Sequence, residues 1–288
     1  MATARQWLEG ARLRTLPVVI APVVAGSGAA AGLDGFVAWK AALCLVVGLA
    51  LQVGVNYAND YSDGVRGTDA VRVGPLRLVG SGLASPAAVK RAAFASLGVA
   101  AVAGLVLAVT SAWWLVLVGA AAIAAAWFYT GGSHPYGYRG LGEVSVFCFF
   151  GLAAGLGTTY VQAGSVGRDA ILAAVACGLL ACAVLLANNL RDIPTDAASG
   201  KRTLSVRIGD RRSRWLYLGL AVLALVIPVA MTTWWALLGL AAAPVLVPAL
   251  RRVASGETGR ALIPVLKWTG FAELVFAAGV AIGLAVAG

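Results

Sequence analysis

The sequence predicts an all-α protein: a polytopic membrane bundle of about nine transmembrane helices in a single domain over residues 1–288. The first observation is composition. Of the residues, 60% are hydrophobic and only 12% are charged, whereas a soluble domain carries about 25% charged residues. The second is the 36 glycines, because small residues let membrane helices approach each other closely. A water-soluble fold could not hide this much apolar surface.

The third observation is a succession of nine apolar runs along the chain. A membrane-spanning helix needs about 20 predominantly apolar residues. The runs cover residues 14–33, 36–58, 90–110, 112–130, 142–163, 169–189, 214–232, 234–250 and 261–286. Short hairpin turns are expected at Thr110-Ser111 and Thr232-Thr233, where neighbouring runs almost touch.

Lysine and arginine gather on one side of this predicted topology. The N-terminus and the loops after the second, fourth, sixth and eighth runs carry most of them, and the loops of the opposite side have only Lys40 and Arg168. Because cytoplasmic loops are enriched in basic residues, we expect the N-terminus and the long loops in the cytoplasm. The net charge of +10 is then explained by the orientation of the protein in the membrane. It predicts a lipid bilayer, and not nucleic acid, as the surrounding partner.

Two long polar loops, at about 60–89 and 190–213, each follow an apolar run that ends in asparagine and aspartate. The first junction contains Asn56, Asn59, Asp60, Asp63 and Asp69, and the second contains Asn188, Asp192 and Asp196. Asn56, Asp60 and Asp63 lie at i, i+4 and i+7, and a helix would place them on one face with Asn59 beside them. The residues of the second junction lie at i, i+4 and i+8 and would do the same. Since the junctions lie four helices apart, they indicate a faint four-helix repeat with a ninth helix added.

The clustered carboxylates favour a divalent cation. Like charges repel each other, and desolvation near the apolar boundary increases the cost. Mg²⁺ prefers one or two carboxylates and shares the rest of its shell with waters and substrate phosphates. Two facing clusters would suit the departure of a diphosphate. The alternative is that these carboxylates are helix caps and interfacial charges, and the match between two motifs on one predicted membrane face argues against it.

Further polar residues near the junctions are candidates for binding a phosphorylated substrate. Guanidinium and ammonium groups pair with phosphate oxygens, although each is equally explained by the positive-inside bias. The basic candidates are Arg14, Arg72, Arg77, Arg139 and Lys201. Tyr129 opens a glycine-rich turn, and its ring would stabilise an allylic cation or belong to an interfacial belt. His134 is the only histidine, which excludes a histidine-based metal site or triad.

These residues resemble the UbiA superfamily of intramembrane prenyltransferases, which have nine helices and two aspartate-rich cytoplasmic loops. The first family motif, Asn-Asp-x-x-Asp-x-x-x-Asp, is matched by Asn59, Asp60 and Asp63. Its last position is Gly67, and Asp69 would substitute for the missing aspartate. The second motif, Asp-x-x-x-Asp, is matched by Asp192 and Asp196 of the other junction.

Within the superfamily, the sequence is most similar to the menaquinone-pathway branch. The similarity rests on the ordered segments 14–17, 59–69, 72–82, 138–143, 189–192 and 200–204. It implies a bacterial plasma-membrane enzyme that transfers a polyprenyl group from a polyprenyl diphosphate to 1,4-dihydroxy-2-naphthoate. Carbon dioxide is lost and demethylmenaquinone forms.

The resemblance also implies roles for individual residues. The expected Mg²⁺ ligands are Asp60, Asp63, Asp69, Asp192 and Asp196, and catalysis would depend on all of these except Asp69, which contributes to the metal site. Asn59 and Asn188, with Asn56 beside them, would orient the metal shell. Lys201, Arg72 and Arg139 would contact the diphosphate. Arg77 or Arg14 would hold the carboxylate of the acceptor.

Two other functions remain open from the sequence. One keeps the fold and changes the acceptor, for example to 4-hydroxybenzoate. The other is a secondary transporter, although transporters place their key charges near the membrane midplane, whereas these carboxylates gather at one face.

Overall fold

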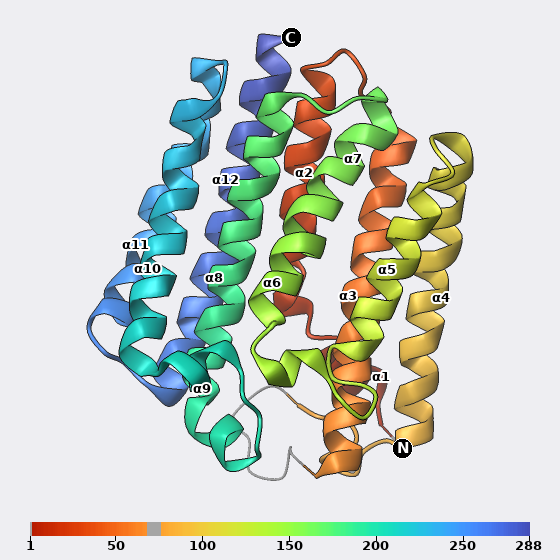
Figure 1. Cartoon of the computed structure of the whole chain (residues 1–288), viewed down its shortest axis with the longest axis vertical. Helices are drawn as coiled ribbons and strands as arrows, with labels where there is room; N and C mark the ends of the chain where they lie inside the picture. Colours follow the sequence, from red (N-terminus) through yellow and green to blue (C-terminus); the bar gives the residue numbers. More distant parts are fainter. Residues whose placement is uncertain (1, 68–75) are drawn as a thin grey trace.

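The computed structural model describes residues 2–67 and 76–288, so the predicted site residues Asp69 and Arg72 lie outside the described residues. Within these ranges all regular secondary structure is helical, and the long helices run roughly side by side (Figure 1). The all-α membrane bundle predicted from the sequence is therefore confirmed.

Twelve α-helices and several shorter helical turns follow each other along the described chain. The α-helices are α1 (Ala4–Gly10), α2 (Pro17–Ala31), α3 (Ala38–Arg66), α4 (Pro86–Thr110), α5 (Leu115–Phe128), α6 (Gly142–Val146), α7 (Ala154–Ala163), α8 (Arg168–Ala198), α9 (Leu204–Ile208), α10 (Asp210–Val226), α11 (Ala242–Ala254) and α12 (Ile263–Ala287). The turns are η1 (Leu13–Thr15), η2 (Tyr136–Arg139), η3 (Phe147–Ala153), η4 (Ile227–Ala230), η5 (Trp234–Ala241) and η6 (Gly259–Leu262). The π-helical segment η3 joins α6 to α7.

The chain is a multi-pass membrane protein, but the predicted count of nine spans is not confirmed. In the described residues, seven helices are long and apolar enough to cross a membrane. An eighth is added if Ala4–Thr15 and Pro17–Ala31, bent by 52° at their junction, count as one span. The remaining predicted run, 112–130, contains only the 14-residue helix α5. Its first residues, through Trp114, form the turn that reverses the chain after α4.

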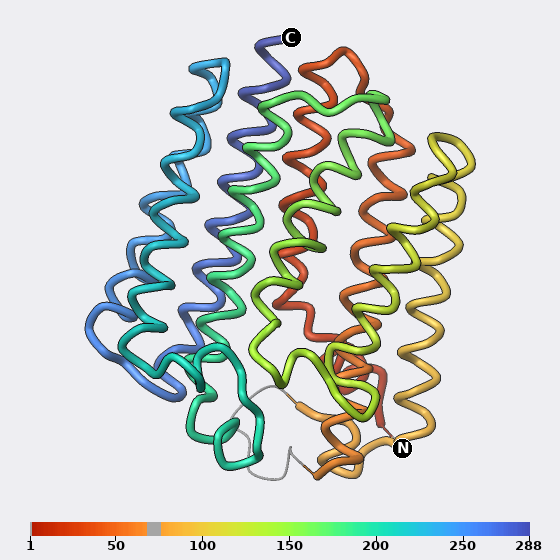
Figure 2. The backbone as a smooth tube through the Cα atoms, in the orientation of Figure 1, coloured from red at the N-terminus to blue at the C-terminus, as the bar shows by residue number. Residues whose placement is uncertain are grey.

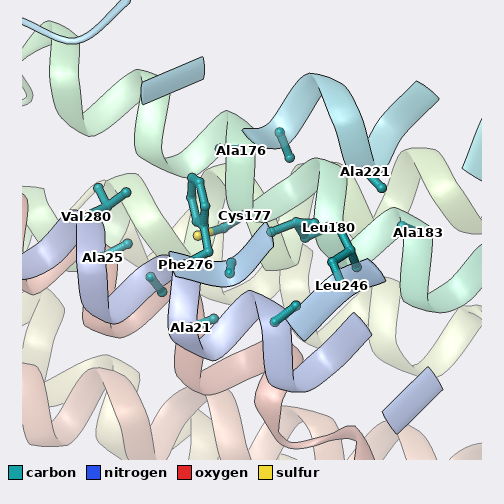
Figure 3. Packing of buried hydrophobic residues seen from close by; sticks show 14 of the residues in the cluster. Ala21, Ala25, Ala176, Cys177, Leu180, Ala183, Ala221, Leu246, Phe276 and Val280 are labelled. Carbon is teal, nitrogen blue, oxygen red and sulfur yellow. The ribbon is translucent and has the colours of Figure 1, made fainter. Parts of the chain in front are cut away.

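The main apolar core lies where α8 packs against α2, α10 and α12, and α11 packs against α10 and α12. Figure 3 shows its centre, where Cys177 and Leu180 of α8 meet Phe276 of α12 and Ala21 of α2. Most of its residues are alanines, and such small side chains let helices approach closely in a membrane, where lipid contacts cannot drive association. One consequence is that α8 is a firmly buried helix at the centre of the bundle.

Figures 1 and 2 show how this packing places the polar segments at one end of the bundle. Helix α1, helix α9 and the connections after α3, α5 and α8 lie at the lower end in this view, and the C-terminus lies at the opposite end. Because α3 and α8 both run downward, their C-terminal turns end in the same region. These turns carry the two asparagine- and aspartate-containing junctions.

The contact between α2 and α12 provides a test of the close packing. A Cβ added at Gly28 would overlap the backbone of Ala281, whereas one added to Gly98 on α4 would meet nothing within 4 Å. We expect Gly28→Ala to force the helices apart and cost about 1–3 kcal/mol, since backbone cannot move aside as a side chain can.

The measurement is thermal unfolding of the purified protein in detergent, and Gly98→Ala is the matched control. That control is expected to be neutral or slightly stabilising, because alanine favours the helix over glycine by about 0.5–1 kcal/mol. Equal unfolding temperatures for the two variants would contradict the packing argument.

Candidate functional site

A cavity with a volume of about 590 Å³ lies inside the bundle and reaches the C-terminal turns of both α3 and α8. Its charged and amide-bearing wall consists of Arg12, Gln52, Asn56, Asn59, Asp63, Arg77, Asn188, Asn189, Asp196 and Lys201, with the hydroxyls of Tyr129, Thr130 and Thr203 nearby. The rest of the wall is largely apolar and comes mainly from α2, α3, α4, α5, η3 and α7. The two sequence junctions therefore meet at one cavity, with an apolar channel attached.

Asp63 is the centre of charge at the polar end. Its side chain is buried, and its Oδ2 lies 3.0 Å from Nζ of Lys201 and 3.4 Å from Nη2 of Arg77. The hydroxyl of Tyr138 donates to Oδ1, and Nζ of Lys201 also lies 4.7 Å from the centre of the Tyr138 ring. A buried carboxylate is costly unless it is paired, and here the two cations that neutralise it are held beside the cavity.

The second junction contributes differently through its two aspartates. Asp196 lines the cavity, and its backbone carbonyl accepts from the Lys201 N–H at 2.9 Å. Asp192 is not among the cavity-lining residues. Its two oxygens accept from Nε and Nη2 of Arg191, each at 2.7 Å, and the same Nη2 donates to Oδ1 of Asn188 at 2.8 Å. Arg191 thus ties Asp192 to a cavity-lining amide.

Asp60 also lies outside the cavity wall, although its sequence position is next to Asn59. Its Oδ2 accepts from the backbone N–H of Leu78 at 2.7 Å, and its Oδ1 accepts from that of Val79 at 3.0 Å. The side chain is only 1% exposed. The carboxylate is therefore directed at the connection that follows α3.

The two asparagines of α3 form hydrogen bonds that link separate segments at the cavity. Oδ1 of Asn59 accepts from the Thr130 hydroxyl at 2.7 Å, which joins α3 to the segment after α5. Nδ2 of Asn56 donates to the carbonyl of Ala11 at 2.9 Å and to the Thr15 hydroxyl at 3.3 Å. The segment that leads into α2 is thereby fastened to the side of α3.

Two predicted phosphate-binding residues do not reach the cavity. Arg14 and Arg139 are exposed, and neither lines the wall. Arg12, which was not predicted, lines it instead. Arg12 has φ of 55°, a left-handed conformation that is uncommon for a residue other than glycine. This turn changes the direction of the chain. The positive-inside distribution of basic residues does not predict such a turn.

Two aromatic residues frame the wall beside α6. Tyr129 lines the cavity, as predicted for a substrate contact, and its ring meets that of Tyr136 edge-on at 5.5 Å. Burial raises the pKa of the Tyr136 phenol, so it stays protonated at neutral pH. Its hydroxyl donates to the carbonyl of Ala125 at 2.8 Å and lies 2.8 Å from Oγ of Ser145.

Glu143, at the start of α6, is a further buried carboxylate close to the site. Its Oε1 accepts from Nδ2 of the cavity-lining Asn189 at 2.9 Å. In the sequence, this residue is marked by its place at the start of an apolar run, where an unpaired carboxylate is costly. The signal did not identify its partner, because the partner lies on a different helix, α8.

Solved structures share this fold. A UbiA homologue from Aeropyrum pernix matches with a TM-score of 0.70 and 15% identity, covering 92% of this chain and 97% of that one. A UbiA homologue from Archaeoglobus fulgidus, bound to GPP and Mg²⁺, matches with a TM-score of 0.65 and 15% identity over 98% and 99% of the two chains.

Curated relatives are much closer in sequence. A 1,4-dihydroxy-2-naphthoate octaprenyltransferase from Mycobacterium tuberculosis is 59% identical over 287 residues, which cover 99% of this chain and 98% of the relative. A protein of the same name from Escherichia coli is 40% identical over 221 residues, 74% of this chain and 72% of that one. The sequence pattern of the UbiA prenyltransferase family matches residues 19–286. The chain therefore belongs to the UbiA prenyltransferase family.

Proposed function

We propose that this protein transfers a polyprenyl group from a polyprenyl diphosphate to 1,4-dihydroxy-2-naphthoate, with loss of carbon dioxide, in menaquinone biosynthesis. The observation that carries the proposal is the single cavity in which a charged end continues into an apolar channel. Such a shape suits a substrate with a doubly charged head and a long hydrocarbon tail. The names of the relatives from Mycobacterium tuberculosis and Escherichia coli support the choice of acceptor.

The apolar part of the cavity is long enough for several isoprene units. Cys44 and Asp63 both line it, and at about 1.5 Å per residue they are separated by roughly 28 Å along α3. This length approaches the hydrocarbon thickness of a bilayer, about 30 Å. The side chains of Val19 and Leu51 and the backbone of Gly48 form part of the wall between them. A prenyl chain placed here would lie along the helices.

Lys201 and Arg77 are the groups best placed to bind the diphosphate. Both line the cavity, and both already contact Asp63. Charge-assisted hydrogen bonds to phosphate oxygens are strong, so these side chains would exchange part of their contact with Asp63 for the diphosphate. The hydroxyl of Thr203 lines the same wall, and it lies two residues after Lys201.

The oxygen-bearing side chains of the cavity suit a Mg²⁺ ion that is also bound by the phosphate oxygens of a substrate. Asp63 and Asp196 line the wall, together with the amides of Asn59 and Asn188, and Asp192 lies one turn from Asp196 on α8. Across residues 2–67 and 76–288, no group of three or more histidine, cysteine, aspartate or glutamate side chains could hold a metal by itself. One or two carboxylates completed by substrate phosphates is the usual Mg²⁺ arrangement. The Mg²⁺ in a structural neighbour supports the same cofactor.

The reaction needs little covalent chemistry from the protein. Bound Mg²⁺ would supply charge stabilisation for the departing diphosphate. As the allylic C–O bond breaks, its electron pair leaves with the diphosphate, and an electron-rich ring carbon of the acceptor forms the new C–C bond. The bond between the ring and the carboxylate then breaks, carbon dioxide leaves, and its electron pair restores the aromatic ring. Lys201 and Arg77 stabilise the charge on the leaving group, and the apolar wall excludes water that would capture the cation. The excess of lysine and arginine in the loops at this end supports a cytoplasmic orientation for it.

The metal proposal predicts that Asp63→Asn and Asp196→Asn each reduce turnover by at least about 100-fold, in the range seen when a transition-state charge stabiliser is removed. Activity should also disappear in EDTA and return with Mg²⁺. Asp34→Asn is the matched control, because Asp34 is exposed and has φ of 54°, a conformation that asparagine tolerates. Full activity after exhaustive chelation would contradict the proposal.

The acceptor is tested by mass spectrometry of products. Purified protein in bilayer nanodiscs, given one polyprenyl diphosphate, should convert 1,4-dihydroxy-2-naphthoate to a prenylated product that lacks the carboxyl group. The same reaction with 4-hydroxybenzoate should give little or no product. A preference for 4-hydroxybenzoate would reassign the acceptor while leaving the metal chemistry unchanged.

A further inference from the structure

Asp60 belongs to the first acidic motif, yet the geometry separates it from Asp63. In α3, the residues Asn56, Asn59 and Asp63 line the cavity and Asp60 does not. One step along a helix turns a side chain by about 100°. Asp60 is therefore rotated from Asn59 toward the connection that follows α3, and its two oxygens receive the N–H groups of Leu78 and Val79.

Two successive backbone N–H groups form an anion-binding concavity, and the carboxylate of Asp60 occupies it. Both oxygens are used in this way, at 2.7 Å and 3.0 Å. Arg12 also interacts electrostatically with the same carboxylate. Because its hydrogen bonds come from the main chain, Asp60 could not turn toward a metal without leaving two N–H groups without partners, at a cost of about 1–3 kcal/mol each when buried.

The segment that Asp60 holds is a compact turn. The N–H of Ser81 donates to the carbonyl of Arg77 at 3.1 Å, and that of Ala84 donates to the carbonyl of Leu78 at 3.0 Å. Leu78 is 0% exposed and packs in a cluster with Ala11 and Tyr57. The turn is therefore held by Asp60 of α3 and by the N-terminal segment.

This turn determines the position of Arg77. The residue immediately precedes Leu78, and its guanidinium lies 3.4 Å from Asp63 and lines the cavity. We infer that Asp60 is a positioning residue, which pins residues 78 and 79 so that Arg77 is presented to the diphosphate, and that it is not a metal ligand. This inference rests on the proposed function for the role of Arg77, and it assigns the metal contact of the first motif to Asp63.

The inference is tested first without any substrate. In Asp60→Asn, the amide offers a donor where an acceptor is needed, so the turn should loosen and trypsin should cut after Arg77 at least about tenfold faster, as for a lost hydrogen bond to a charged group. Asp34→Asn is the matched control, because Asp34 is exposed and is not part of this turn, so it should keep the wild-type cleavage rate at this bond. Mass spectrometry identifies the cut. Unchanged cleavage in Asp60→Asn would overturn the inference.

The second measurement is kinetic and separates Asp60 from a ligand. Asp60→Asn should raise the KM for polyprenyl diphosphate about tenfold and leave the Mg²⁺ concentration for half-maximal activity unchanged, whereas Asp63→Asn should raise that concentration. The double variant Asp60→Asn/Arg77→Gln should be no worse than Arg77→Gln alone, since the two residues act through one contact. A raised Mg²⁺ requirement in Asp60→Asn, or multiplied effects in the double variant, would overturn it.

The outcomes distinguish this inference from the proposed function. If the wild-type protein makes no product from dihydroxynaphthoate, the proposed function fails, and the cleavage measurement still decides whether Asp60 pins the turn. If Asp60→Asn does not fold while Asp63→Asn does, the anchoring role is supported, because Asp63→Asn keeps the hydrogen bonds of Asp60 to the main chain.

Discussion

The arrangement of the polar end depends on the neutralisation of one buried carboxylate. Asp63 lies buried in the last turn of α3, and an ion in such surroundings costs several kcal/mol unless partners compensate it. Its partners Lys201, Arg77 and Tyr138 come from three different connections between helices. The requirement of one charge therefore draws the segments after α3, α5 and α8 together over the cavity.

The same requirement explains why the site is built from loops at the ends of rigid helices. Helix α8 is held by close packing of small residues, and α3 packs mainly against α4, so their C-terminal turns are firmly placed. The cavity occupies the space between them. Lys201 bridges it, with its N–H on the carbonyl of Asp196 and its ammonium on Asp63. Lys201 therefore links the two distant motifs in one site.

Much of this arrangement could be predicted from the sequence. The membrane bundle follows from composition and apolar runs, and the meeting of the two junctions follows from their place on the same predicted membrane face. The spacing of Asn56, Asp60 and Asp63 predicts that all three share one face of α3, but only Asn56 and Asp63 of this set line the cavity. What spacing cannot give is the partner of each carboxylate. Asp60 accepts from the backbone N–H groups of Leu78 and Val79. These groups are close to it in space but lie 18 and 19 residues further along the chain, outside the spacing of the motif.

Other differences have equally physical causes. Arg12 replaces Arg14 at the cavity because a left-handed residue turns the chain, and neither hydropathy nor charge bias reports a backbone dihedral angle. The run at 112–130 yields a short helix because the residues through Trp114 form a turn, although their hydropathy alone continues the pattern. Sequence periodicity thus predicts helices better than it predicts where a chain reverses.

The wall of the apolar channel indicates how a long hydrocarbon chain is accommodated. Leu105 of α4 and Val116 of α5 line the cavity, and they are 50% and 40% exposed. Helix α5 buries only Ala126 fully, and several of its other residues line the cavity. A tail that enters from the bilayer between such helices passes only apolar atoms, whereas a tail threaded through the charged end would displace the contacts of Asp63. The hydrophobic effect therefore separates the route of the tail from the place of the diphosphate.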